Sequence, residues 1–175
     1  MNIVIINYNA GNSKSLQNAI IKSGYNAKIS NKPTDVETSD IIFIAGVGSA
    51  KYALNYIKKH NLDGILYKKL ILEKTKYIGI CLGMHILFDY LEEDGGVEGL
   101  GFIQGKVKKI ESKQTPHVGW NNLIKNGKNY YFDHSYKVEC SHNIIVDKVM
   151  YQKEIIPAYI KKENLIGFQF HPLIT

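Results

Sequence analysis

The chain has 175 residues, of which 45% are hydrophobic, and a formal net charge of +6. This length suits one domain with a sizeable core, and the apolar runs are far shorter than the roughly 20 residues that span a bilayer. The 22 basic residues are all lysines and are dispersed, which favours a solvated basic surface over a nucleic-acid site, where arginine is common.

The first half alternates between strand and helix patterns. Apolar runs predict strands, and apolar residues at helical spacing predict helices. In chain order we expect a strand over Ile3–Asn7, a helix from Asn12 or Ser13 that ends at Gly24, strands over Asn26–Ser30 and Asp40–Ala45, helices over Ser49–Lys59 and Leu62–Glu73, a strand over Tyr77–Ile80 and a helix over Leu82–Leu91.

After Glu93-Asp94-Gly95-Gly96 the pattern becomes β-rich. We expect strands over Phe102–Ile110, Val118–Ile124, Tyr130–Val138, Ile144–Gln152, Ala158–Lys162 and Leu165–Phe170. No linker or repeat divides the chain. The prediction is therefore a single α/β domain over residues 1–175, with a flavodoxin-like parallel sheet flanked by helices and a β-rich second half that is antiparallel in part.

Cys81 lies in Gly79-Ile80-Cys81-Leu82-Gly83, between a predicted strand and a predicted helix. This pattern is typical of a nucleophile elbow, where a strand turns sharply into a helix and presents the reactive atom at the corner. The flanking glycines allow close backbone packing, and a helix N-terminus favours the thiolate. A buried core cysteine is the alternative for this motif taken alone.

A cysteine nucleophile needs a base and a site for the oxyanion. His171, at the end of a predicted strand, is the candidate base. Backbone N–H groups at Leu82 and in Gly46-Val47-Gly48 are candidates for the oxyanion, because glycines let the backbone approach a ligand. A simple strand-to-helix turn is the alternative for Gly46–Gly48. Both loops follow parallel strands, whose carboxyl ends gather catalytic groups.

Together these motifs resemble the class I glutamine amidotransferases, and within them the glutaminase subunits that serve imidazole glycerol phosphate synthesis in histidine biosynthesis. The resemblance is carried in family order by residues 7–12, 45–48, 79–84, 95–101, 116–121, 131–136 and 167–172. It implies the class I glutamine amidotransferase fold and a heterodimer with a (β/α)8-barrel cyclase subunit. It implies no cofactor and no metal, and the composition indicates no nucleic-acid or membrane partner. The two cysteines, Cys81 and Cys140, have no disulfide-framework spacing, so we expect a cytoplasmic protein with reduced thiols.

The resemblance also implies residue roles. Cys81 attacks the glutamine side-chain amide, His171 protonates the departing ammonia, and water hydrolyses the thioester while ammonia passes to the partner. Contacts to the oxyanion and to glutamine are implied for Gly46, Val47, Gly48, Leu82, His85, His134, Ser135 and Tyr136. Contacts to the partner are implied for Asn12, Trp120 and Asn121.

Three features depart from the family pattern. Leu173 stands where the family has the glutamate that orients the histidine, and leucine supplies neither its charge nor its hydrogen bond. The sequence stops at Thr175, where the family continues with a closing helix, so we expect a truncated domain with one sheet face exposed. His85 and Ala45 stand where the subfamily usually has glutamine and proline; for His85, packing or substrate contact is favoured over a new catalytic role.

Two alternatives stay open. A related glutaminase subunit supplies ammonia for the amidation of surface sugars, and nothing in this chain identifies the acceptor. A catalytically impaired subunit that only binds the partner is the second alternative, because of Leu173. Among the other histidines, His60 is expected to be solvated and His117 to be structural. Cys140, His142 and His134 match no metal-ligand spacing.

Overall fold

The computed structural model describes residues 1–9 and 13–172. Two residues from the sequence analysis, Asn12 and Leu173, lie outside the described residues. The first half contains β1 (Ile3–Ile6), α1 (Ser13–Lys22), β2 (Ala27–Ser30), α2 (Pro33–Glu37), β3 (Ile41–Gly46), α3 (Ala50–Lys59), α4 (Leu62–Tyr67), the π-helix η1 (Lys68–Leu72), β4 (Lys76–Cys81) and α5 (Leu82–His85).

The second half is built almost entirely of strands. It contains β5 (Phe88–Leu91), the 3-10 helix η2 (Glu93–Gly95), β6 (Val97–Glu98), β7 (Ile103–Lys109), β8 (His117–Asn122), β9 (Asn129–His134), β10 (Tyr136–Cys140), the 3-10 helix η3 (His142–Ile144), β11 (Ile145–Tyr151), β12 (Glu154–Lys162) and β13 (Leu165–Phe168). The change of pattern predicted from the sequence is confirmed.

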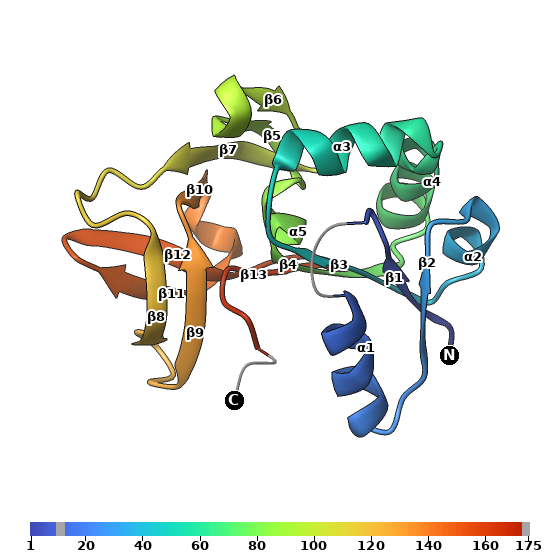
Figure 1. Ribbon diagram of the computed structural model, residues 1–175, viewed down its shortest axis with the longest axis horizontal. Helices are drawn as coiled ribbons and strands as arrows, with labels where there is room; N and C mark the ends of the chain where they lie inside the picture. Colours follow the sequence, from blue (N-terminus) through green and yellow to red (C-terminus); the bar gives the residue numbers. More distant parts are fainter. Residues whose placement is uncertain (10–12, 173–175) are drawn as a thin grey trace.

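A central sheet of seven strands organises the molecule, in the order β11-β12-β13-β4-β3-β1-β2. The strands from β13 to β2 pair in parallel, and β12 and β11 extend the sheet in the antiparallel sense. Helices α3, α4 and α5 lie on one side of this sheet and α1 lies on the other (Figure 1). The predicted α/β class, with a parallel sheet and a β-rich second half, is confirmed.

Two smaller sheets stand beside the central one. One has the order β10-β7-β5-β6, and the other is the β8-β9 hairpin. The expected single strand over Tyr130–Val138 was wrong, because the chain leaves β9 at His134 and enters β10 at Tyr136. Each segment pairs in a different sheet, β9 with β8 and β10 with β7, so the break at Ser135 changes the partner strand.

The helix expected over Leu82–Leu91 was also wrong. Helix α5 ends at His85, and Phe88–Leu91 forms β5, which pairs with β7 and β6. The carbonyls of Ile86, Leu87 and Phe88 accept hydrogen bonds from the backbone N–H groups of Leu100, Phe102 and Gly101, at 2.8, 2.9 and 3.2 Å. These non-local bonds take the acceptors that a longer helix needs, and tertiary context overrides the local pattern.

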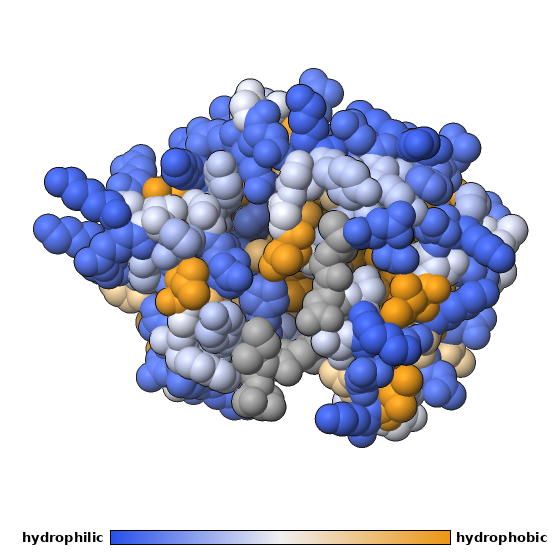
Figure 2. All heavy atoms as spheres, viewed as in Figure 1, coloured by the Kyte–Doolittle hydropathy of each residue, from blue (hydrophilic) through white to orange (hydrophobic). Residues whose placement is uncertain are grey.

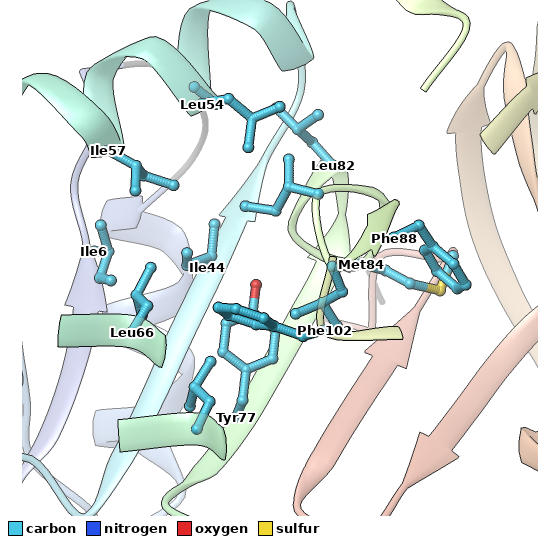
Figure 3. Close-up of a cluster of buried hydrophobic side chains, with 14 of the residues drawn as sticks. Ile6, Ile44, Leu54, Ile57, Leu66, Tyr77, Leu82, Met84, Phe88 and Phe102 are labelled. Carbon is cyan, nitrogen blue, oxygen red and sulfur yellow. The ribbon is translucent and has the colours of Figure 1, made fainter. Parts of the chain in front are cut away.

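The main hydrophobic core lies between the sheet and the helices α3, α4 and α5. Leu54 and Ile57 of α3 belong to the same buried cluster as Ile44 of β3 and Tyr77 of β4, and Tyr77 lies beside Leu66 and Phe102 (Figure 3). The Tyr77 hydroxyl donates a 2.6 Å hydrogen bond to the carbonyl of Gly83, and burial raises the pKa of this phenol well above its usual value. Tyr77 therefore ties the first turn of α5 to the core.

The opposite sheet face, beside α1, carries an apolar groove of about 450 Å³ whose walls include Leu16, Ile20, Phe43, Ile78 and Phe168. On the face shown in Figure 2, hydrophobic residues form small separate patches among hydrophilic ones. None of the helices in residues 1–9 and 13–172 is long and apolar enough to cross a membrane.

Candidate active site

Cys81 occupies a sharp corner between β4 and α5. Its backbone has φ +52° and ψ −108°, a conformation that side-chain-bearing residues rarely adopt. Such backbone strain persists only where the surroundings hold it, and it clusters at functional sites. The strand-to-helix turn predicted from the glycine spacing is present.

The corner is fixed by close contacts that only glycine permits. A Cβ atom on Gly83 would lie 1.9 Å from the carbonyl oxygen of Ile44, in the neighbouring strand β3. A Cβ atom on Gly46 would lie 1.3 Å from the hydroxyl oxygen of Tyr8. Because Gly46 is also the register partner of Cys81, these contacts bring the end of β3 directly beside the elbow.

A cavity of about 200 Å³ opens at this corner. Its wall contains Cys81, two acidic residues, and all but one of the residues predicted to contact the oxyanion and glutamine. The wall residues are Val47, Gly48, Cys81, Leu82, His85, Glu93, Asp133, His134, Ser135 and Tyr136. Gly46 supports the wall from the end of β3 without lining it. The fold thus collects segments from both halves of the chain around one sulfur atom.

Glu93 and Asp133 are wall residues that the sequence analysis missed. Glu93 Oε2 accepts a 3.2 Å hydrogen bond from the backbone N–H of Ala50, at the start of α3, and burial raises the pKa of this carboxyl. Asp133 precedes the predicted His134 along β9. The only local signal for Glu93 was its position just before Gly95-Gly96, which reads equally well as a solvated turn.

The Cys81 thiol is 6% exposed and has two nearby polar partners. Its Sγ donates to the Asp133 carbonyl at 3.9 Å and accepts from Gln169 Nε2 at 3.6 Å. Burial raises the pKa of this thiol to about 12, and Asp133 and Glu93 add to the increase, while the Leu82 N–H and Gln169 oppose it. The N–H of Leu82, the first residue of α5, favours the thiolate as expected, but burial outweighs this effect in the free protein.

His171 lies beyond the end of β13, next to the strand that carries Cys81. Its backbone N–H donates to Tyr131 O at 2.8 Å, which fixes the residue against β9. Its Nε2 is buried and has no hydrogen-bond partner among the described residues. Burial lowers the pKa of His171, and the Asp133 carboxylate opposes this effect.

Cys81 and His171 therefore share Asp133 as a neighbour, but within residues 1–9 and 13–172 no hydrogen bond joins them directly. His171 is not among the residues that line the cavity. Catalytic hydrogen bonds are often incomplete before substrate binds, and the role of His171 as the base stays a prediction.

Two histidines form a buried series of hydrogen bonds beside the cavity. His134 Nδ1 lies 2.7 Å from the carbonyl oxygen of Tyr136 and must donate to it. His134 Nε2 then accepts from His117 Nδ1 at 2.9 Å, and His117 Nε2 accepts from Asn121 Nδ2 at 3.3 Å. Burial lowers the pKa of His134 to about 3 and that of His117 to about 4, so both rings are neutral.

This series of hydrogen bonds changes the interpretation of two predicted residues, His134 and Asn121. Both ring nitrogens of His134 are used within the protein, so its contribution to the cavity is its ring surface and its support of Ser135 and Tyr136. Asn121 turns its amide inward, to His117 and to the carbonyl of Met150. Trp120 is 51% exposed and is available to a partner.

The remaining chemistry of the described residues is sparse. His85 is buried in the cavity wall and bonds to Gln169 rather than to the sulfur. Within residues 1–9 and 13–172, no group of three or more His, Cys, Asp or Glu side chains is arranged to hold a metal ion. Cys140 and His60 lie outside the cavity wall.

Known proteins resemble this chain in sequence and in fold. The family model described as glutamine amidotransferase class-I matches residues 4–173. A protein of Staphylococcus aureus (strain bovine RF122 / ET3-1) named imidazole glycerol phosphate synthase subunit HisH is 40% identical over 175 residues, with 97% of this chain and 88% of that protein covered. A Methanococcus maripaludis protein named imidazole glycerol phosphate synthase subunit HisH 2 is 40% identical over 187 residues, covering 97% of this chain and 91% of that protein.

Solved structures agree on the fold. A crystal structure of a glutamine amidotransferase superposes with a TM-score of 0.81 at 15% identity, covering 98% of this chain and 91% of that one. A glutamine amidotransferase from Thermotoga maritima superposes with a TM-score of 0.64 at 12% identity, covering 99% of this chain and 76% of that one. At these identities the likeness concerns the fold alone.

Proposed function

Because the chain belongs to the class I glutamine amidotransferase family, we propose that it is the glutaminase subunit of an imidazole glycerol phosphate synthase. It hydrolyses glutamine and delivers the ammonia to a (β/α)8-barrel cyclase subunit in histidine biosynthesis. The observation that carries the proposal is the placement of Cys81 at a strained corner, facing a cavity walled by Val47, Gly48 and Leu82.

The cavity walls suit a small amino-acid amide. The carboxylate of Glu93 offers an ionic partner for the ammonium group of glutamine, and Ser135 and Tyr136 offer polar contacts on the other wall. Backbone N–H groups at Leu82 and in the Val47–Gly48 loop are the candidate donors for the oxyanion, since glycine leaves the approach open.

The reaction begins when His171 takes the proton of Cys81 Sγ and the thiolate attacks the amide carbon of glutamine. The carbonyl oxygen becomes an oxyanion, the C–N bond breaks, and the departing nitrogen takes a proton from His171 and leaves as ammonia. Water then attacks the glutamyl thioester, and glutamate leaves with the thiol restored. Burial raises the pKa of the free thiol, so we propose that substrate or partner binding promotes its deprotonation.

The partner surface is proposed on β8, where Trp120 is exposed. The hydrogen bonds from Asn121 through His117 to His134 join this strand to the cavity wall. A barrel subunit that binds at Trp120 thus contacts a strand whose side chains continue into the glutamine site.

The test is covalent labelling by a glutamine-like diazo-ketone, read by mass spectrometry of the intact protein and its peptides. We expect one adduct on Cys81, faster in the presence of a barrel partner, and none in Cys81→Ser. Cys140→Ser is the matched control, because Cys140 lies outside the cavity wall, and it should label like the parent protein.

A second candidate function is a subunit that binds the partner without turning over glutamine. The observation that favours it is His171 Nε2, which is buried and has no hydrogen-bond partner among the described residues. Absence of any Cys81 adduct with partner and acceptor present would select this candidate. The acceptor itself, imidazole precursor or surface sugar, is identified by which barrel partner copurifies with the chain.

A further inference from the structure

Three buried side chains lie in a row from α5 to the sulfur of Cys81. His85 Nε2 lies 2.7 Å from Gln169 Oε1, and Gln169 Nε2 lies 3.6 Å from Cys81 Sγ. Their exposures are 4% for His85, 0% for Gln169 and 6% for Cys81, so water competes little for these contacts. Cys81 directly precedes α5, His85 is its last residue, and Gln169 comes from the segment after β13.

The polarity of this row follows from the chemistry of the groups. The Gln169 amide nitrogen carries only donors, and its carbonyl oxygen carries only acceptors. With the nitrogen toward sulfur, the oxygen faces His85, so His85 Nε2 must carry the hydrogen. Burial lowers the pKa of His85 to about 4, which keeps the ring neutral and lets it hold that single tautomer at physiological pH.

The Cys81 sulfur needs this donor more than an exposed thiol does. The charged groups nearest to it are the carboxylates of Glu93 from η2 and Asp133 from β9, and both oppose a thiolate. The titratable groups that also face this corner are Tyr8, His85, His134 and His171. Only the Leu82 backbone N–H and the Gln169 amide act in favour of the anion among the described groups.

We propose that His85 is a positioning residue that holds the Gln169 carboxamide with its nitrogen toward Cys81, so that this amide donates a hydrogen bond to the attacking thiolate. The inference rests on the proposed function only in taking Cys81 as the nucleophile. Without the His85 donor, the carboxamide is free to turn over and present its oxygen to the sulfur, which repels the anion. His85 thus acts on the sulfur through Gln169.

The experiment measures thiolate formation directly and needs no glutamine turnover. In the Cys140→Ser background, the rate of Cys81 alkylation by iodoacetamide is followed against pH, with peptide mass spectrometry to confirm the modified residue. Gln169→Met removes both amide groups at similar length. His85→Leu removes the donor, and His85→Gln supplies a new N–H donor from an uncharged side chain. Met84→Leu, on the same short helix and also fully buried, is the matched packing control.

We expect alkylation at neutral pH to fall about tenfold in Gln169→Met and in His85→Leu, with the pH profile displaced upward, because hydrogen bonds to charged groups are strong. His85→Gln should recover most of the rate, and Met84→Leu should follow the parent profile. The Gln169→Met/His85→Leu double variant should be no slower than either single variant, since both act through one bond.

Unchanged alkylation profiles in folded Gln169→Met and His85→Leu proteins would overturn the proposal. A full additional loss of alkylation rate from His85→Leu in the Gln169→Met background would also overturn it. If Gln169→Met fails to fold, Gln169→Glu decides, because this isosteric change replaces the donor by an acceptor and must slow alkylation further. A protein that alkylates as expected but never hydrolyses glutamine refutes the proposed function and leaves this inference standing.

Discussion

Gly79 and Gly83 meet across the corner that holds Cys81: a Cβ atom on Gly79 would lie 2.4 Å from the carbonyl oxygen of Gly83. The same Gly83 carbonyl accepts the hydrogen bond of the Tyr77 hydroxyl. Gly83 therefore packs closely against the backbone of β3 and of β4, and it also accepts a hydrogen bond from the side chain of Tyr77. The Cys81 conformation is held by these contacts rather than by its own preference.

Alanine at position 83 should therefore disrupt the elbow. Because the obstacle is the backbone oxygen of Ile44, at 1.9 Å, no side chain can move aside, and we expect Gly83→Ala to cost about 3 kcal/mol of unfolding free energy. Urea denaturation followed by circular dichroism measures the loss. Gly64→Ala is the control: this helical glycine has open space around it, and the change should stabilise the protein by about 1 kcal/mol. Equal effects at the two sites would contradict this account.

Glycine at position 81 should relieve the strain of the corner. A positive φ costs a side-chain-bearing residue about 1–3 kcal/mol, which exceeds the extra backbone entropy that glycine loses on folding. We expect Cys81→Gly to be more stable than Cys81→Ala by about 1 kcal/mol, although both lack the nucleophile. Paired thermal and urea unfolding curves compare the two variants. An alanine variant that is the more stable of the two would show that the corner is unstrained.

Stability should fall as the pH decreases from about 6.5 toward about 4. Burial lowers the pKa of His85, His117 and His134 below the unfolded value, so each takes up a proton on unfolding in this window. Each uptake lowers the unfolding free energy by up to about 1.4 kcal/mol per pH unit. Urea midpoints measured across this range give the slope. In His85→Gln the slope of unfolding free energy against pH should correspond to one fewer proton taken up on unfolding. An unchanged slope in that variant would show that His85 is not neutral in the folded protein.

The ion pair between Lys137 of β10 and Glu154 of β12 should matter more than the surface pairs. It joins the β10-β7-β5-β6 sheet to the central sheet, and its side chains are 17% and 18% exposed. Lys137→Met leaves the Glu154 carboxylate without its cation, and we expect a loss of about 3 kcal/mol.

The control is Lys108→Met, which breaks a pair whose side chains are 41% and 47% exposed. It should cost less than about 1 kcal/mol, because water screens that pair. Adding Glu154→Gln to Lys137→Met should restore part of the loss. Urea unfolding measures both losses. A similar loss of unfolding free energy in both lysine variants would show that the Lys137–Glu154 pair contributes no more to stability than an exposed pair.

Most of the central sheet was predictable because its signals are local. Apolar runs at β1, β3 and β4, each followed by glycine or by the Cys81 motif, fixed the strand positions to within about a residue or two. The second-half strands were found for the same reason. The elements that escaped prediction are the short helix α2, the short strands β5 and β6, and the break at Ser135. At β5 and at Ser135 the pairing with neighbouring strands overrides the local pattern: β5 pairs with β6 and β7, and the chain changes its partner from β8 to β7.

What the sequence by itself indicated is the corner at Cys81, because glycines two residues before and after a cysteine, between an apolar run and a helical pattern, are typical of a sharp strand-to-helix turn. The family and the expected roles of Cys81 and His171 also came from such local motifs. What only the tertiary structure decided is the protonation state of the residues in the site. The raised pKa of Cys81, the neutral ring of His85 and the bond between His85 and Gln169 depend on burial and on residues far apart in the chain. Desolvation, which shifts these pKa values, depends on how the whole molecule packs, so a local sequence pattern does not predict it.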